Sequence, residues 1–313
     1  MSAIKPRIVF MGTPEFSVPA LKTLIDQAEV LAVYTQPDKP VGRGLQMQPS
    51  PVKRVALERG IPVFTPEKVS LPEEVERLRA YQADFFVVVA YGQILKLPVI
   101  EAPRYGTINI HSSLLPRWRG AAPIHWALLS GDVETGITTM MIVPKLDAGD
   151  ILLQEKTSVT AEDTAQSLHD RLSEMGARLI LPTLQGLMEG TLKPRPQDEA
   201  MVTYAHKLSK EMEVLDWTKP AREIDRSVRA LNPWPGTRIE DQGLKLKIKK
   251  GSLDTHTAKV KPGALFQRFG GLYAACGEGS YRILEVQEEG KKAISANDFL
   301  NGLRNRGVRL PEA

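Results

Sequence analysis

Apolar residues in the N-terminal half of the chain occur in two patterns, as short continuous runs and as longer segments with helical spacing. A short apolar run bounded by turn residues predicts a buried strand. The strongest run, Asp84–Ala90, is β-branched and aromatic and apolar on both faces, which is typical of a central parallel strand. Further runs predict strands at Arg7–Met11, Val30–Tyr34, Ile61–Phe64, Gly106–His111 and Thr138–Val143.

Helical patterns separate most of these runs. They lie at Ser17–Gln27, Pro51–Arg59 and Glu73–Ala80, and a longer one follows at Asp163–Glu189. This alternation predicts an α/β domain in which helices cover both faces of a Rossmann-like parallel sheet. Ligands of such sheets bind at the carboxyl ends of the strands. Because GTPEF (Gly12–Phe16) follows the first strand in place of G-x-G-x-x-G, we expect no dinucleotide there.

The character of the sequence changes after a proline-containing stretch at Thr191–Met201. A helix is predicted at Ala221–Leu231, and glycine-punctuated apolar runs follow it. They lie at Leu244–Ile248, Gly263–Phe266, Gly271–Ala275 and Tyr281–Leu284. These short strands predict an OB-like β-barrel of five strands. We therefore expect a catalytic domain at residues 1–190, a linker at 191–208 and a barrel domain at 209–313.

Charge is unevenly distributed between these parts. Residues 209–313 carry 19 Lys and Arg against 14 Asp and Glu, whereas residues 1–208 carry 22 against 23. The basic excess favours a polyanionic partner, although a solvated basic surface is the simpler explanation of charge alone. The only cysteine, Cys276, leaves no disulfide framework and favours a reducing compartment. No apolar stretch suits a signal peptide or a membrane span, so we expect a cytoplasmic protein.

Chemically versatile side chains follow two of the predicted strands. Asn109 and His111 end the run Gly106–His111, and they face the same way because side chains alternate along a strand. The next loop is rich in apolar and aromatic residues, as in the wall of a pocket. Asp147 follows another strand, and an aspartate beside a histidine fixes its tautomer and suits it to proton transfer. Taken singly, each residue is at least as well explained by a structural role.

The same residues carry a resemblance to a known family. Asn109-x-His111, the string SLLPRWRGAAPI (Ser113–Ile124) and Asp147 resemble the 10-formyltetrahydrofolate-dependent formyltransferases, most closely the branch that acts on methionyl-tRNA. Supporting strings are GTPEF, YTQPDKPVGRG (Tyr34–Gly44), SPVK (Ser50–Lys53), VVVAYGQIL (Val87–Leu95), TYAHKLSKE (Thr203–Glu211) and NPWPG (Asn232–Gly236). The chain departs from the family at KLDAGD, where GLDTGD is usual, so Lys145 and Ala148 replace residues of the family pattern beside Asp147.

The resemblance implies transfer of a formyl group from 10-formyltetrahydrofolate to the α-amine of methionyl-initiator tRNA. It implies that Asn109, His111 and Asp147 are catalytic. Asn109 and protonated His111 would donate to the developing oxyanion, and His111 would pass a proton from the amine to the folate nitrogen. The implied folate site consists of Ser113, Leu114, Leu115 and Pro116, with backbone groups of Ala90, Tyr91 and Gly92. The histidines show no metal-ligand spacing, and no metal is expected.

The resemblance also implies contacts with tRNA. The loop Tyr34–Lys53 is basic and has Arg43 between two glycines, which suits it to phosphate contact. Lys245, Lys247 and Lys249 are spaced by two, so they are predicted to share one strand face as a phosphate track. The implied tRNA contacts are Arg43, Lys39, Lys207, Lys245, Lys247 and Lys249, on a protein that we expect to act as a monomer.

Two other functions compete with this one. A formyltransferase acting on glycinamide ribonucleotide or an amino sugar would share only the core around residues 80–150. The basic loop, NPWPG and the basic β domain argue against it. An RNA-binding module with an inactive α/β domain would have no need of Asn109, His111 and Asp147 together.

Overall fold

A computed structural model describes residues 5–41 and 46–312 of the chain. The chain folds into two compact units. The N-terminal unit comprises Met1–Pro123, Glu134–Ser158 and Ser167–Ala205, and the C-terminal unit comprises Ile124–Val133, Val159–Gln166 and His206–Ala313. Most of the expected linker therefore belongs to the N-terminal unit.

A seven-stranded sheet forms the centre of the N-terminal unit, in the order β10-β9-β7-β6-β1-β2-β5. Its parallel strands are β1 (Arg7–Gly12), β2 (Glu29–Tyr34), β5 (Val63–Phe64), β6 (Phe85–Val89) and β7 (Thr107–His111). Every residue of β6 is buried, as its apolar pattern predicts. The prediction of a Rossmann-like α/β sheet is confirmed.

Two strands at one edge of this sheet differ from the prediction. β9 (Glu134–Met141) pairs antiparallel with β7, and β10 (Ile151–Ser158) pairs antiparallel with β9. The expected strand Thr138–Val143 is therefore displaced, and the sheet is not wholly parallel. An apolar run does not reveal strand direction, and the pattern missed β10 because this edge strand is partly polar.

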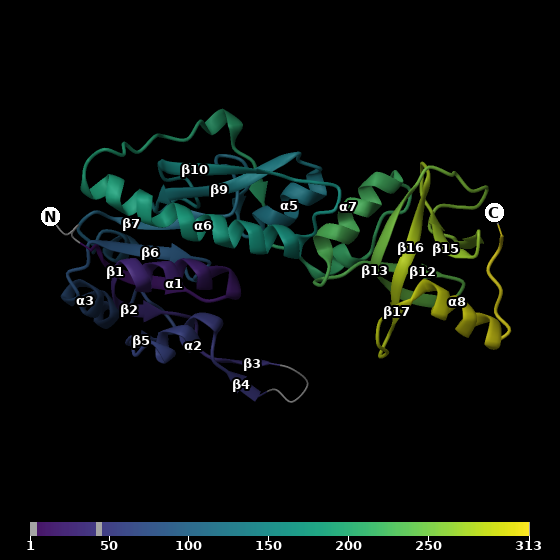
Figure 1. The fold of residues 1–313 in the computed structure, drawn as a ribbon, viewed down its shortest axis with the longest axis horizontal. Coiled ribbons are helices and arrows are strands. Elements are labelled where there is room, and N and C mark those ends of the chain that lie inside the picture. The colour runs from purple at the N-terminus through teal and green to yellow at the C-terminus, as the bar shows by residue number, and fades with distance from the viewer. Residues whose placement is uncertain (1–4, 42–45, 313) are drawn as a thin grey trace. The chain divides into compact units, whose positions relative to one another are not determined.

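Helices cover both faces of the sheet, with α1 and α6 on the viewed face (Figure 1). The predicted helices correspond to α1 (Val18–Gln27), α2 (Pro51–Glu58), α3 (Pro72–Ala80) and α6 (Ala165–Met188), and α4 (Leu97–Ile100) is an additional short helix. On one face, Val9 and Val88 pack in a cluster with Val75 of α3. On the other, Gly176 brings α6 against Ile110 of β7. The strands that carry the candidate site are thus fixed from both sides.

Short elements complete the N-terminal unit. They are η1 (Glu15–Ser17), β3 (Lys39–Val41), β4 (Gln46–Gln48), β8 (Arg119–Gly120), η2 (Glu199–Met201) and β11 (Tyr204–Ala205). β3 and β4 form an antiparallel hairpin within the loop predicted to meet tRNA. β8 pairs with β11, so the end of the expected linker lies beside the loop that follows His111.

The C-terminal unit is built on a curled antiparallel sheet in the order β12-β13-β16-β15-β14, with β17 paired to β16. The strands are β12 (Arg238–Asp241), β13 (Leu244–Asp254), β14 (Leu265–Arg268), β15 (Gly271–Ala275), β16 (Ser280–Glu288) and β17 (Ile294–Ser295). The helices are α5 (Pro123–Ser130), η3 (Lys210–Glu213), α7 (Ala221–Leu231) and α8 (Ala296–Asn305). Ile224 of α7 and Phe299 of α8 share one core with Ile283 of β16. The OB-like prediction is confirmed, and α8 is an addition to it.

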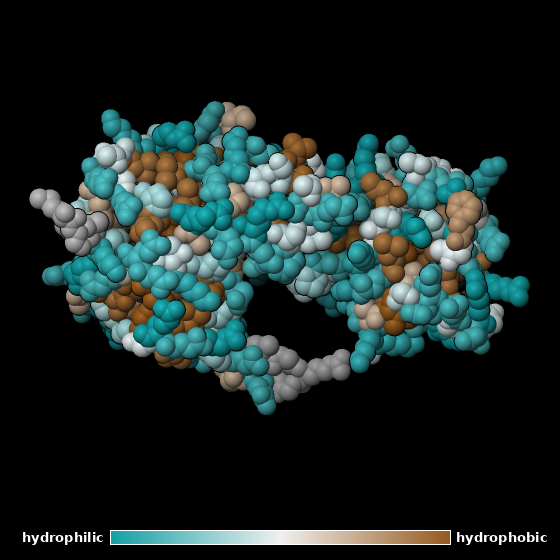
Figure 2. Space-filling model, viewed as in Figure 1, coloured by the Kyte–Doolittle hydropathy of each residue, from teal (hydrophilic) through white to brown (hydrophobic). Residues whose placement is uncertain are grey.

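Hydrophilic residues cover most of the viewed surface, and hydrophobic residues show between them in separate groups (Figure 2). Ile94 and Phe269, each 88% exposed, lie in different units. In the part of the chain that the structure describes, no helix is both long and apolar enough to cross a membrane.

Candidate active site

The imidazole of His111 ends β7 and is almost completely buried. Its Nε2 lies 2.9 Å from the main-chain oxygen of Trp118. Because a carbonyl oxygen only accepts, Nε2 carries the proton of this hydrogen bond, and the neutral ring has its lone pair on Nδ1. Nδ1 is therefore the atom that can exchange a proton with a substrate.

The carboxylate of Asp147 faces the same nitrogen. Its Oδ2 lies 3.9 Å from His111 Nδ1 and accepts a 2.8 Å hydrogen bond from the amide of Gly120. A separation of 3.9 Å is too long for a direct hydrogen bond, but it allows both groups to bond a third atom between them. The ring is thus oriented by Trp118, whereas the sequence predicts that role for Asp147.

Asp147 reaches this position by a different route from the predicted one. Because β9 is antiparallel to β7, the end of β9 lies beside the start of β7, where Met141 pairs with Ile108. Residues 142–150 then fold back without regular secondary structure, and Asp147 adopts a φ of 45°. Gly149 passes so close to the Met141 carbonyl that a Cβ would collide with it. The KLDAGD loop therefore needs its glycine.

Asn109 lies two residues before His111 on the same side of β7 and is half-buried. Its backbone position is fixed by pairing with Val88 on one side and Met140 on the other. Within the described part of the chain, its carboxamide makes no hydrogen bond. Its N–H donors are therefore available to a substrate oxygen. The structure thus brings His111 and Asp147 together, and Asn109 lies on the same side of β7 as His111. The catalytic roles of these three residues stay a prediction.

The predicted folate residues 113–116 are of two kinds. Ser113 and Leu115 are buried: the Ser113 hydroxyl donates to the Arg117 carbonyl at 2.6 Å, and Leu115 packs in a small core. Leu114 and Pro116 are half-buried. Leu114 and Pro116 are therefore the more accessible of the four side chains. Folate contact by any of the four stays a prediction.

The other predicted folate segment, Ala90–Gly92, follows β6. Ala90 and Gly92 are exposed and have φ values of 47° and 89°. The Tyr91 side chain is buried. The main-chain carbonyl of Tyr91 accepts a 2.9 Å hydrogen bond from the Thr13 hydroxyl. Burial raises the pKa of the Tyr91 phenol, so the group stays neutral. The exposed backbone of Ala90 and Gly92 is the part that a ligand can reach.

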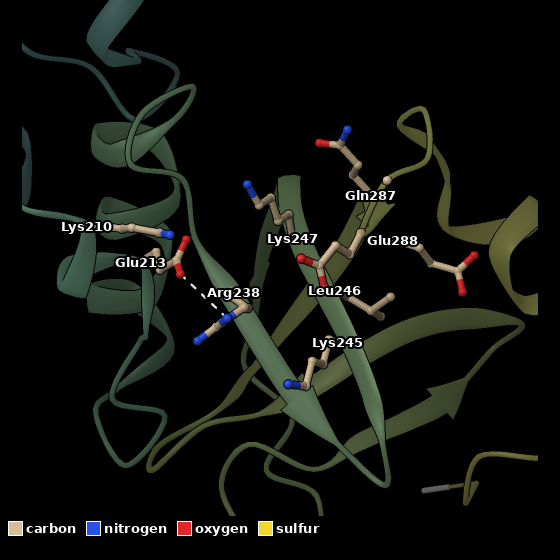
Figure 3. A pocket seen from close by; sticks show the side chains of 10 residues that line it. Lys210, Glu213, Arg238, Lys245, Leu246, Lys247, Gln287 and Glu288 are labelled. Atoms are coloured by element: carbon tan, nitrogen blue, oxygen red, sulfur yellow. Dashed lines mark ion pairs between the residues drawn. The ribbon is translucent and has the colours of Figure 1, made fainter. Parts of the chain in front are cut away.

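Both basic and acidic residues of the C-terminal unit line a pocket, with Lys210, Arg238, Lys245 and Lys247 beside Glu213, Glu288 and Glu289 (Figure 3). Lys245 and Lys247 extend from β13, and Arg238 extends from β12 toward Glu213, at 3.6 Å. Lys245 lies 3.9 Å from Glu240. Among the described residues, no carboxylate lies within 4.0 Å of the Lys247 ammonium. Lys247 therefore makes no direct ion pair at this pocket.

Lys249 does not line this pocket. The register of β13 against β16 shifts between Ile248 and Lys250, which interrupts the alternation of side chains. Lys249 lines a second cavity of the same unit, together with Asn232. Lys249 is half-buried whereas Lys245 and Lys247 are exposed, and their shared strand face stays a prediction.

The remaining predicted tRNA residues lie elsewhere. Lys39 begins β3 and is exposed, and Lys207 is exposed in the C-terminal unit. Arg43 lies outside the described residues. Lys53 of the same loop pairs with Asp38 at 2.7 Å, so its charge is compensated.

The groups at the site that sequence reasoning missed are main-chain atoms, the Trp118 carbonyl and the Gly120 amide. Both belong to the string SLLPRWRGAAPI, which the sequence identifies only as a pocket wall. The one feature of the sequence that could have indicated these main-chain contacts is Gly120. Gly120 has a φ of 119°, and a Cβ there would lie 2.6 Å from the Ala205 carbonyl oxygen.

Comparisons with known proteins identify the family of this chain. The family profile described as "Formyl transferase" matches residues 6–184, and "Formyl transferase, C-terminal domain" matches residues 207–304. The methionyl-tRNA formyltransferase of Methylococcus capsulatus is 50% identical over 305 residues, which are 97% of this chain and 99% of that protein. The methionyl-tRNA formyltransferase of Citrifermentans bemidjiense is 48% identical over 300 residues, 95% of this chain and 94% of that protein.

Solved structures share the fold at lower identity. WlaRD, a sugar 3N-formyl transferase, has a TM-score of 0.67 at 19% identity and covers 93% of this chain and 100% of its own. HypX from Aquifex aeolicus, solved in complex with tetrahydrofolic acid, has a TM-score of 0.63 at 19% identity. The match covers 98% of this chain and 49% of HypX, so this chain spans about half the length of that protein. The chain therefore belongs to the formyl transferase family, in which its full-length relatives are methionyl-tRNA formyltransferases.

Proposed function

We propose that this chain transfers the formyl group of 10-formyltetrahydrofolate to the α-amine of methionyl-initiator tRNA at Asn109, His111 and Asp147. The reaction is that of its full-length relatives, and it serves translation initiation. The observation that carries the assignment of the site is the pairing of His111 Nδ1 with Asp147 Oδ2 at 3.9 Å, beside the half-buried Asn109.

The role of Asn109 follows from the charge that develops when the amine attacks the formyl carbon. The formyl oxygen becomes an oxyanion, and the Asn109 amide donates a hydrogen bond to it. A preorganised donor of this kind stabilises the transition state by about 2.7–4 kcal/mol. The half-buried position supports this role, because the interaction is stronger where water is partly excluded.

A proton must leave the attacking amine, and a proton must reach the departing folate nitrogen. We propose that His111 accepts the amine proton on Nδ1 and then donates it to the folate nitrogen. Nε2 is not available for this transfer, because it donates to the Trp118 carbonyl. Asp147 stabilises the imidazolium that forms between the two transfers, since its carboxylate lies 3.9 Å from Nδ1. The Gly120 amide holds the carboxylate there. This sequence of steps needs no covalent intermediate.

The substrates are proposed to contact surfaces of both units. The pterin would lie against Leu114, Pro116 and the backbone of Ala90 and Gly92, because these are the accessible parts of the two folate segments. The tRNA phosphates would contact Lys247, since its ammonium makes no direct ion pair with a described carboxylate. The further proposed tRNA contacts are Lys39, Arg43, Lys207, Lys245 and Lys249.

The test of this function is a comparison of acceptors. Labelled formyl from 10-formyltetrahydrofolate is offered to the protein with methionyl-initiator tRNA, glycinamide ribonucleotide or a nucleotide-linked amino sugar. We expect rapid N-formylation of the charged tRNA and no more than background transfer to the small acceptors. Preferential formylation of a small acceptor would contradict the proposal.

We further propose that the chain acts in the cytoplasm as a monomer. Its acceptor is a charged tRNA, and its one thiol is buried and therefore unsuited to linking two chains. Light scattering of the protein without tRNA should give the mass of a single chain, 34.6 kDa. A mass twice as large would contradict the monomer.

A further inference from the structure

We propose that the segment Gln197–Ala205 is part of the catalytic apparatus: Gln197 and Glu199, through the buried Arg119, set the separation of His111 and Asp147. The segment lies in the expected linker, and none of its residues touches the reacting groups in the proposed mechanism. Gln197 and Glu199 are therefore positioning residues. The inference rests on the proposed function, because it concerns how that site is held in shape.

The tripeptide Trp118–Gly120 connects the two catalytic side chains. The carbonyl of Trp118 accepts from His111 Nε2 at 2.9 Å, and the amide of Gly120 donates to Asp147 Oδ2 at 2.8 Å. The residue between them is Arg119. The conformation of this tripeptide therefore helps to set how the imidazole and the carboxylate lie relative to one another.

The side chain of Arg119 anchors the tripeptide to the segment Gln197–Ala205 through hydrogen bonds. It is completely buried, and burial of a guanidinium is costly unless its donors are satisfied; its Nε and Nη2 are bonded, whereas its Nη1 has no partner among the described residues. Its Nε donates to Gln197 Oε1 at 3.0 Å, and its Nη2 donates to Glu199 Oε1 at 2.9 Å. Hydrogen bonds from Arg119 and then Lys145 lower the pKa of the Glu199 carboxyl to about 2. The carboxylate is consequently charged throughout the neutral range.

The same segment also holds the loop of Asp147. The amide of Gln197 donates to the carbonyl of Asp147 at 2.8 Å and to that of Gly149 at 2.7 Å. The second oxygen of Glu199 accepts from Lys145 at 2.7 Å. Lys145, which departs from the family pattern, thereby ties its loop to the segment that anchors Arg119. Gln197 is the only described side chain that bonds both Arg119 and the Asp147 backbone.

Backbone strain makes this support necessary. Trp118 and Asp147 have φ values of 64° and 45°, in the left-handed region that side chains other than glycine rarely adopt. Such conformations persist when the surrounding structure over-determines them. The amide of Trp118 donates to the Thr203 hydroxyl and that of Arg119 to the Thr203 carbonyl, both at 2.9 Å. One segment thus fixes both strained residues.

The test compares substitutions in the accessible part of the network. Gln197 is half-buried and the Glu199 side chain is 60% exposed, so Gln197→Ala, Glu199→Ala and Glu199→Gln should fold. Glu134→Gln is the matched control, because Glu134 forms an exposed 2.9 Å ion pair with Lys156 elsewhere in the same unit. Single-turnover formyl transfer, substrate KM, melting temperature and the ¹⁵N shifts of the His111 ring are measured for each.

Gln197→Ala should lower the single-turnover rate about 10- to 100-fold, as expected for a small misplacement of catalytic groups. The KM for methionyl-initiator tRNA should stay within about twofold of the wild-type value, because misplaced catalytic groups lower kcat and leave substrate binding unchanged. Glu199→Gln should keep most of the rate that Glu199→Ala loses, because an amide oxygen still accepts from Arg119. The ¹⁵N shifts of Gln197→Ala should show that His111 no longer holds one tautomer.

A Gln197→Ala protein that melts lower but turns over at the wild-type rate would overturn the proposal, because its role would then be structural only. Equal losses in Glu199→Gln and Glu199→Ala would overturn the hydrogen-bonding role of Glu199. A wild-type protein that does not formylate methionyl-initiator tRNA would refute the proposed function instead. The His111 tautomer, measured without substrate, would still decide whether Gln197 positions the ring.

Discussion

Replacement of Asn109 by alanine removes the proposed oxyanion donor and no other hydrogen bond of the described side chains. No buried partner is left unsatisfied, so the free energy of unfolding should change by about 0.5 kcal/mol or less. The transition state should lose about 2.7–4 kcal/mol, which corresponds to about 10²- to 10³-fold in rate. The assay is single-turnover transfer of labelled formyl to methionyl-initiator tRNA with both substrates saturating, alongside thermal unfolding.

Asn109→Asp is the matched variant for this prediction. It keeps the shape of the side chain, but a carboxylate cannot donate and places negative charge where the oxyanion develops. Its rate should equal or fall below that of Asn109→Ala. A loss of less than about threefold in Asn109→Ala, with an intact fold, would refute the oxyanion role. An aspartate variant faster than the alanine variant would also refute it.

Other predictions follow from the same geometry. Asp147→Asn keeps an acceptor for the Gly120 amide but not the charge that stabilises the imidazolium, so turnover should fall about 10²-fold with little change in tRNA KM; an unchanged rate would remove Asp147 from the mechanism. The double variant Lys245→Ala/Lys247→Ala should weaken tRNA binding and reduce the salt slope of log K by about two, whereas an unchanged slope would exclude phosphate contact there. Because the pKa of Glu199 is lowered to about 2, the stability from its ion pairs is present above the ordinary glutamate pKa and lost as pH falls through the folded value. The melting temperatures of wild type and Glu199→Gln should therefore differ by a constant amount near neutral pH and converge in acid, and convergence at neutral pH would contradict the assigned pKa. Burial raises the pKa of Cys276 to about 12, so a thiol reagent at pH of about 8 should label it only after unfolding, and rapid labelling of the native protein would contradict its burial.

The apolar pattern predicted the strands that carry the site, because burial on both faces leaves a clear signal. β6 and β7 lie close to their predicted positions, with Asn109 and His111 at the end of β7. The direction of β9 was not predictable, because antiparallel and parallel strands bury the same residues. The sequence placed Asp147 at a strand's carboxyl end, yet the irregular return of residues 142–150 brings it to His111.

Side-chain patterns also could not reveal contacts made by main-chain atoms. The orientation of His111 depends on the Trp118 carbonyl, and that of Asp147 on the Gly120 amide. The period-two spacing of the lysines on β13 did not reveal the bulge beside Lys249, and Lys249 lines a different cavity from Lys245 and Lys247. Arg119 is completely buried, and nothing in the residue pattern of its loop indicated this.

The most direct test of the account replaces His111 by glutamine. The glutamine amide can still donate to the Trp118 carbonyl, but it provides no base at the position of Nδ1. We predict that His111→Gln binds methionyl-initiator tRNA as tightly as the wild type and loses single-turnover formyl transfer by about 10²-fold or more. A folded His111→Gln protein that transfers formyl at the wild-type rate would contradict the assignment of the reaction to this site.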